Sequence, residues 1–99
     1  MYEKGKMNGR RNCHDIIAEM LKAASGGKMK THIMYELKLS YPQLVEYLSI
    51  LVEKEFLANK TVRRGKRETT VYRTTLKGID LLGHLESINK LWTEKRIGI

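Results

Sequence analysis

The sequence predicts an α+β fold that is mostly helical: three short helices, a two-stranded β-hairpin and a long C-terminal helix. Two observations support this prediction. Apolar residues recur at helical spacing in four segments, whereas β-branched and aromatic residues flank a glycine-containing loop in a fifth segment. With 99 residues, the chain is long enough for one domain with a core of modest size.

The first two helices are expected over residues 10–25 and 31–37. Gly26 and Gly27 end the first helix, and a tight turn at residues 38–39 follows the second. The predicted core face of the first helix consists of Cys13, Ile16, Ile17, Met20, Leu21 and Ala24. That of the second helix consists of Ile33, Met34 and Leu37.

The third helix has the clearest start signal in the chain. Ser40 is suited to the N-cap, and Gln43 follows three residues later, as in a capping box. Pro42 lies in the first turn, where its missing N–H has no helical acceptor to lose. The helix is expected to reach about residue 55. Its predicted core face consists of Leu44, Tyr47, Leu48 and Leu51, and the opposite face begins with Gln43, Glu46 and Ser49.

A basic hairpin is expected next, with residues 62–68 as its loop around the central Gly65. Charge is concentrated there. Residues 60–73 contain six basic residues and one acidic residue, a net +5, and residues 1–14 contain four and one, a net +3. The rest of the chain has nine of each sign, so these two segments account for the whole net charge of +8. An exposed cationic hairpin suits a polyanion, and nucleic acid is the commonest one inside cells.

The last helix is expected over residues 75–96, with Thr75 as its N-cap. Its second half repeats apolar residues at spacings of four, three and four, which predicts a coiled-coil seam made by Leu81, Leu85, Ile88 and Trp92. The alternative is that the whole face packs on the domain. Leu76, Ile79 and Leu82 offer a separate face for the domain, so we favour a homodimer in which the seam pairs with a second copy.

Catalytic and metal chemistry are not indicated. Cys13, His14 and Asp15 are adjacent, so on a helix their side chains diverge and cannot converge as a triad. His32 and His84 are scattered, and a single cysteine gives no zinc-site spacing. We therefore expect no enzyme activity, no metal, no cofactor and no small-molecule ligand. No apolar run reaches the roughly 18 residues that span a bilayer, and no secretory signal is evident, which predicts a cytoplasmic protein without a membrane partner.

The order helix, helix, tight turn, helix, basic hairpin is that of a winged helix-turn-helix. The sequence resembles the archaeal winged-helix family of small basic DNA-binding proteins, which includes chromatin-associated members that dimerise through a C-terminal antiparallel coiled coil. The resemblance also implies association with the nucleoid. The resemblance rests on residues 15–21, 30–35, 39–48 and 72–78, the last of which carries Tyr72, Thr75 and Gly78 in a Tyr-x-x-Thr-x-x-Gly pattern. It divides the chain into a flexible basic arm (1–9), a winged helix-turn-helix domain (10–76) and a dimerisation helix (77–99).

This resemblance implies a duplex-DNA-binding protein, either a transcription regulator or a chromatin-associated protein. The third helix would approach the major groove, and the wing would reach the adjacent minor groove or backbone. The candidate contact residues are Arg63, Arg64, Lys66, Arg67, Gln43, Tyr41, Lys30, Arg10 and Arg11. Gln43 can read adenine, or it can serve only the capping box. Tyr41 lies at the DNA boundary or covers the core.

A second hypothesis remains open at this point, namely a winged-helix module that mediates protein contacts without touching DNA. The basic loop favours DNA, because a surface used for protein contacts is usually neutral or apolar. Single-stranded RNA is disfavoured, because no exposed aromatic platform is evident.

Overall fold

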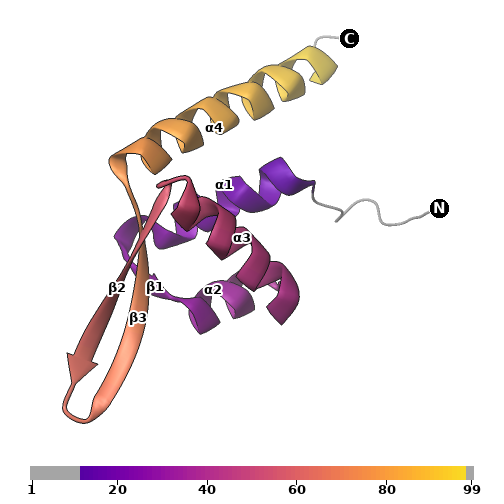
Figure 1. Cartoon of the computed structure of the whole chain (residues 1–99). Coiled ribbons are helices and arrows are strands. Elements are labelled where there is room, and N and C mark those ends of the chain that lie inside the picture. Colours follow the sequence, from indigo (N-terminus) through magenta and orange to yellow (C-terminus); the bar gives the residue numbers. More distant parts are fainter. Residues whose placement is uncertain (1–11, 98–99) are drawn as a thin grey trace.

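The computed structural model describes the backbone of residues 12–97 and the side chains of residues 12–91. Within this range four α-helices and one short 3₁₀ helix combine with a three-stranded antiparallel sheet in the order β1-β3-β2 (Figure 1). The elements are α1 (Cys13–Ala23), η1 (Ala24–Gly26), β1 (Lys28–Met29), α2 (Lys30–Leu37), α3 (Tyr41–Glu53), β2 (Leu57–Arg64), β3 (Arg67–Thr74) and α4 (Leu76–Ile97). The predicted fold class is confirmed.

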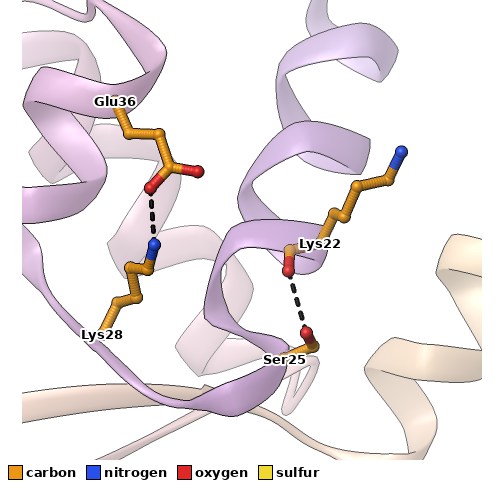
Figure 2. A network of polar contacts seen from close by, with 4 residues as sticks. All are labelled: Lys22, Ser25, Lys28 and Glu36. Atoms are coloured by element: carbon orange, nitrogen blue, oxygen red, sulfur yellow. Dashed lines mark hydrogen bonds and ion pairs between the residues drawn. The ribbon is translucent and has the colours of Figure 1, made fainter.

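Helix α1 begins later than expected, because Asn12 caps it. The Asn12 Oδ1 atom accepts a hydrogen bond from the Asp15 N–H at 2.8 Å, and the Asp15 carboxylate accepts one from the Asn12 N–H at 3.2 Å. This reciprocal arrangement satisfies two donors at the start of the helix. At the other end, the Ser25 hydroxyl donates to the Lys22 carbonyl at 2.9 Å (Figure 2). The α-helix is therefore shorter than the expected 10–25, although η1 continues the helical turns to Gly26. Cys13, which was predicted on the core face, is exposed.

The sheet has one strand more than the sequence analysis expected. Gly27 has a φ of +92°, which glycine tolerates, and it turns the chain so that Lys28 and Met29 lie opposite Tyr72 and Val71 of β3. An ion pair of 2.6 Å between the Lys28 Nζ and the Glu36 carboxylate then ties β1 to α2 (Figure 2). The additional strand, β1, thus holds the start of α2 against the hairpin.

The turn between α2 and α3 forms as predicted. Lys38 adopts the left-handed conformation with a φ of +59°, and Ser40 caps α3 with both bonds of a capping box. The core face of α3 is confirmed: Leu44, Leu48 and Leu51 are buried, while Tyr47 is half-buried against them. Removing these leucine side chains from water contributes roughly 1.5–3 kcal/mol each to folding, so α3 is held firmly against the core.

The hairpin turn is tighter than the expected seven-residue loop. β2 and β3 pair along their whole length, from Leu57 opposite Thr74 to Arg64 opposite Arg67. Only Gly65 and Lys66 remain between the strands, and Gly65 has a φ of +61° whereas the φ of Lys66 is not positive. A positive φ at the first central residue alone is typical of a type II′ turn, whose twist matches that of the strands. The arginines at the tip therefore lie within the strand ladder.

Helix α4 crosses the domain beside α1, while the hairpin projects away from it on the opposite side (Figure 1). Its start is fixed by Thr75, as predicted. The Thr75 hydroxyl accepts a hydrogen bond from the Gly78 N–H at 3.0 Å and donates to the Glu55 carbonyl at 2.7 Å. Gly78 lies so close to the Phe56 carbonyl that an added Cβ would overlap its oxygen.

This contact turns α4 in a way that the sequence analysis did not anticipate. Leu85 is buried, at 9% exposure, and Leu81 and Leu82 pack against the core. Leu76 and Ile79, which were expected to face the domain, are 87% and 48% exposed, so that prediction is wrong. Gly78 must face Phe56, and residues four and seven positions later in a helix lie on the same face, so Leu82 and Leu85 face inward. Leu76 and Ile79 are consequently turned toward solvent.

Candidate nucleic-acid interface

The wing, defined here as β2, β3 and the turn between them, concentrates positive charge on one projecting element. Arg63 forms an ion pair of 2.7 Å with the Glu68 carboxylate, directly opposite it across the ladder. Arg64, Lys66 and Arg67 form no ion pair with any other described residue. Three of the four predicted wing cations are thus available to a ligand, and the fourth is largely neutralised.

Two further basic side chains belong to the wing, although they were not among the candidate contact residues. Lys60 lies in β2 opposite Val71, and Arg73 lies in β3 opposite Ala58. Both side chains are exposed. Side chains two residues apart in a strand point to the same face. Counting in steps of two back from Arg64 reaches Lys60, and counting forward from Arg67 reaches Arg73, so the sequence could have identified both.

The exposed surface of α3 is not basic. Gln43, Glu46, Ser49 and Glu53 are exposed, and none of them is a cation. The Gln43 side-chain oxygen accepts hydrogen bonds from the Ser40 N–H at 3.1 Å and from the Ser40 hydroxyl at 3.2 Å. The capping box therefore explains the position of the Gln43 side chain. A base-reading role for Gln43 remains a prediction.

Lys30 and Tyr41 lie together where α2, α3 and the sheet meet. The Lys30 Nζ is 5.6 Å from the centre of the Tyr41 ring, a cation–π distance. Both side chains line an open hollow of about 430 Å³ between α3 and the wing, together with Val45, Ser49, Asn59 and Tyr72. Tyr41 is 55% exposed, so it lies at the surface and does not cover the core.

The nearby Lys28 is held by Glu36, as Figure 2 shows, and so adds little free charge to this region. Arg10 and Arg11 lie outside the described residues, as does the whole basic arm. The structure therefore brings together Lys30 and Tyr41 in one place and Arg63, Arg64, Lys66 and Arg67 in another. Gln43 does not line the hollow that Lys30 and Tyr41 share, and neither do the four wing cations.

The four residues of the predicted dimer seam do not share one environment. Leu81 and Leu85, expected in the seam, lie against the domain within the single chain, and Ile88 is 61% exposed. The side chain of Trp92 lies outside the described part of the structure. Leu91, which was not predicted, is 66% exposed. The apolar surface that α4 offers to solvent therefore differs from the predicted seam.

No cluster of metal-ligand side chains is assembled in the described residues. Within residues 12–91, no three His, Cys, Asp or Glu side chains gather as a metal site would require. His84 lies 3.6 Å from the Asp80 carboxylate on the exposed surface of α4, and Cys13 is exposed at the start of α1. No helix in the described part of the chain combines the length and apolar character that a bilayer crossing requires.

Solved structures with the same fold include regulators and a DNA-binding protein. Sso10a-2, a DNA-binding protein from Sulfolobus solfataricus, has a TM-score of 0.76 and 24% identity, covering 89% of this chain and 88% of its own. A PadR family transcriptional regulator from Eggerthella lenta has a TM-score of 0.73 and 16% identity, covering 81% and 76%. These identities show a common fold.

A third similar structure contains a nucleic acid. It is a point mutant of MepR from S. aureus bound to an oligodeoxyribonucleotide, with a TM-score of 0.68 and 16% identity, covering 86% of this chain and 61% of its own. No curated protein matches this chain in sequence. A family model described as winged helix-turn-helix matches residues 10–93, which is most of the chain and includes every element from α1 to the greater part of α4. The chain belongs to the winged helix-turn-helix family.

Proposed function

We propose that this protein binds duplex DNA and acts as a transcription regulator or a chromatin-associated protein at the nucleoid. The observation that carries the proposal is the set of cations on the projecting wing that form no ion pair with another described residue, namely Arg64, Lys66 and Arg67. Clustered cations release counterions from the phosphate backbone, and this release drives DNA binding. The fold likeness to Sso10a-2, described as a DNA-binding protein, and to MepR bound to an oligodeoxyribonucleotide supports the same function.

The distribution of charge also indicates how DNA contacts are divided between the elements. The wing supplies phosphate contacts, which position a protein on DNA but carry little sequence information. Helix α3 would face the major groove, but it presents Glu46 and Ser49, with the oxygen of Gln43 already bonded to Ser40. The commonest base-reading contacts come from Arg, Lys, Asn or Gln, whereas Glu46 could accept a hydrogen bond only from cytosine and would repel the nearby phosphates. We therefore expect binding that depends strongly on salt and weakly on sequence.

A binding titration with random duplex and with genomic fragments, at several salt concentrations, tests this proposal. Chromatin-like binding gives similar affinities for both DNA samples and a steep salt dependence. Operator binding gives a subset of fragments bound at least about a thousandfold more tightly than random duplex. Failure to bind either sample at low salt would contradict the proposed function.

We further propose that two copies pair through the outer face of α4. Four large apolar residues are exposed there: Leu76, Ile79, Ile88 and Leu91. Along the helix, residues four apart form rows. Leu76 and Ile88 are the two ends of one such row, and Ile79 and Leu91 are the two ends of the neighbouring row. Asp80, His84 and Ser87 lie between them in these rows, so the apolar residues are at the two ends of the face. Exposed large apolar residues that gather in this way mark interaction surfaces.

The spacing of these residues is self-complementary. Leu76 and Leu91 are equally far from the midpoint between Gly83 and His84, and so are Ile79 and Ile88. An antiparallel pair of α4 helices centred on that midpoint would therefore place each Leu76 against the Leu91 of the other copy, and each Ile79 against its Ile88. Gly83 has no atom of its own chain within 4 Å of an added Cβ, so it allows close approach at the crossing. Rows spaced by four favour a crossing angle of about 50°.

Pairing would also strengthen DNA binding, because two wings on one duplex make the second contact intramolecular. The same apolar face supports the alternative function, a module that binds another protein. Homodimerisation in solution favours the first function, whereas a monomer with no DNA affinity favours the second.

A further inference from the structure

The strand ladder sorts the wing residues onto two faces. Side chains of residues directly opposite each other in an antiparallel pair point to the same side of the sheet, and the sides alternate along each strand. One row of pairs contains Leu57 with Thr74, Asn59 with Tyr72, Thr61 with Thr70, and Arg63 with Glu68. The other row contains Ala58 with Arg73, Lys60 with Val71, Val62 with Thr69, and Arg64 with Arg67.

The first row faces the domain. Leu57 is buried in the core, and the Thr74 hydroxyl donates a hydrogen bond of 2.6 Å to the Leu21 carbonyl of α1. Asn59 and Tyr72 line the hollow beside α3. The second row therefore forms the outer face of the wing, on the side of the sheet away from α3.

The free positive charge of the wing lies on this outer face and the turn. Lys60, Arg64, Arg67 and Arg73 all belong to the outer row, and no carboxylate does. The row facing the domain has one cation, Arg63, and Glu68 neutralises it at 2.7 Å. The exposed residues of α3 include Glu46 and Glu53, whose charge repels phosphate. The two sides of the wing thus differ by four positive charges.

The outer face is also hollowed. A depression of about 450 Å³ lies between the wing and the start of α2, lined by Met29, His32, Val62, Arg64, Arg67 and Thr69 among others. The Arg73 guanidinium lies over Gly27, with one nitrogen 3.0 Å from where a Cβ on that glycine would be. The lining combines the apolar side chains of Met29, Val62 and Val71 with the cations Arg64 and Arg67. This combination suits a sugar–phosphate strand, because the sugar offers apolar surface and the phosphates offer charge.

We infer that the outer face of the wing is the principal phosphate-binding surface of this protein, with Lys60 and Arg73 as contact residues in addition to Arg64 and Arg67. The inference rests on the proposed function, duplex-DNA binding, and adds the side of the wing along which the backbone runs. Helix α3 then contributes little to affinity. In the surface between α3 and the wing, the charge of Lys30 is balanced by that of Glu53, so this surface adds little net charge.

Neighbouring residues of the wing provide a matched test. Arg63 and Arg64 are the same residue type at adjacent positions of β2, on opposite faces. Arg64→Gln and Lys60→Gln each remove one outer charge, whereas the double variant Arg63→Gln with Glu68→Gln removes a neutral pair. Binding to a mixed-sequence duplex is followed by fluorescence anisotropy over a salt series. All positions are exposed, and circular dichroism verifies that each variant keeps its helical signal.

Each outer variant is expected to weaken binding by about threefold to tenfold at moderate salt and to lower the salt slope by about one unit. The neutral double variant is expected to bind within about twofold of the unaltered protein, because the net charge of its face is unchanged. The face assignment is overturned if the double variant loses as much affinity as Arg64→Gln, or if Lys60→Gln and Arg64→Gln leave the salt slope unchanged while the unaltered protein binds. Absence of duplex binding by the unaltered protein would overturn the proposed function itself.

Discussion

Arg64 and Arg67 lie directly opposite each other across the wing, at the last residue of β2 and the first residue of β3. Two like charges in this position destabilise a ladder by a few tenths of a kcal/mol up to about 1 kcal/mol. Nothing in the described structure offsets them, because neither has a carboxylate partner. The pair leaves two uncompensated positive charges side by side at the end of the hairpin, an arrangement that favours binding of a polyanion.

The first prediction follows from this opposition. Arg67→Glu would create an attractive pair with Arg64, so the free energy of unfolding is expected to rise by up to about 1 kcal/mol. DNA affinity is expected to fall, because one cation is lost, its neighbour is neutralised and a negative charge is added. Thermal unfolding and anisotropy on the same sample measure both effects. A variant that is less stable and binds DNA equally well would show that the two arginines serve the fold.

The second prediction concerns the cap of α3. Ser40→Ala removes the hydroxyl that accepts the Gln43 N–H, at 3.3 Å, and is expected to lower the free energy of unfolding by about 0.5–2 kcal/mol. Ser49→Ala is the matched control, since Ser49 is exposed within the same helix and should change stability little. DNA affinity of the folded protein should be retained in both. A large loss of affinity at an unchanged melting temperature would mean that Ser40 contacts phosphate.

The third prediction concerns the close approach at the start of α4. Gly78→Ala would place a Cβ onto the Phe56 carbonyl oxygen and 2.7 Å from the Thr74 Cγ2 atom. The backbone must shift, so the melting temperature is expected to fall, although alanine normally stabilises a helix interior by about 1 kcal/mol relative to glycine. Gly83→Ala, whose Cβ meets no atom of its own chain within 4 Å, should raise it in dilute protein. Equal effects of the two substitutions would contradict the packing described here.

The fourth prediction separates the two faces of α4. Ile88→Asp places a charge on the outer face and is expected to give monomers that keep their helical signal and bind DNA at least about tenfold more weakly, since the second wing is lost. Leu85→Ala is expected to lower the free energy of unfolding by about 2–5 kcal/mol, because Leu85 is buried in the domain. Sedimentation of the unaltered protein should show a dimer. A dimeric Ile88→Asp variant would remove this face as the interface.

Local signals in the sequence predicted local structure well. Ser40 and Gln43 form the expected capping box, and Thr75 caps α4, because both signals involve residues within one helical turn. The Asn12 and Asp15 box was missed although it is equally local; an Asn-x-x-Asp spacing before the apolar run would have revealed it.

The features that depend on distant contacts were not predictable in the same way. β1 has only two residues, too few for any periodicity, and it exists because Gly27 turns the chain beside β3. The rotation of α4 is decided by Gly78 against Phe56, so the split between buried Leu85 and exposed Leu76 could not be read from spacing alone. The neutralisation of Arg63 depends on the hairpin register, which a seven-residue loop would have made different.

The salt dependence of duplex binding tests the central claim most directly. The unaltered protein and the Arg64→Ala, Arg67→Ala double variant are titrated against duplexes of several sequences from low to moderate salt. With three free cations at the turn and its flanks, and each phosphate contact contributing about 0.9 to the slope, the slope of log K against log salt is expected to be steeper than about −2.5. The double variant should be weaker on every sequence, with the slope reduced by about two units. Unchanged affinity and slope in the double variant would contradict the claim that the wing binds DNA.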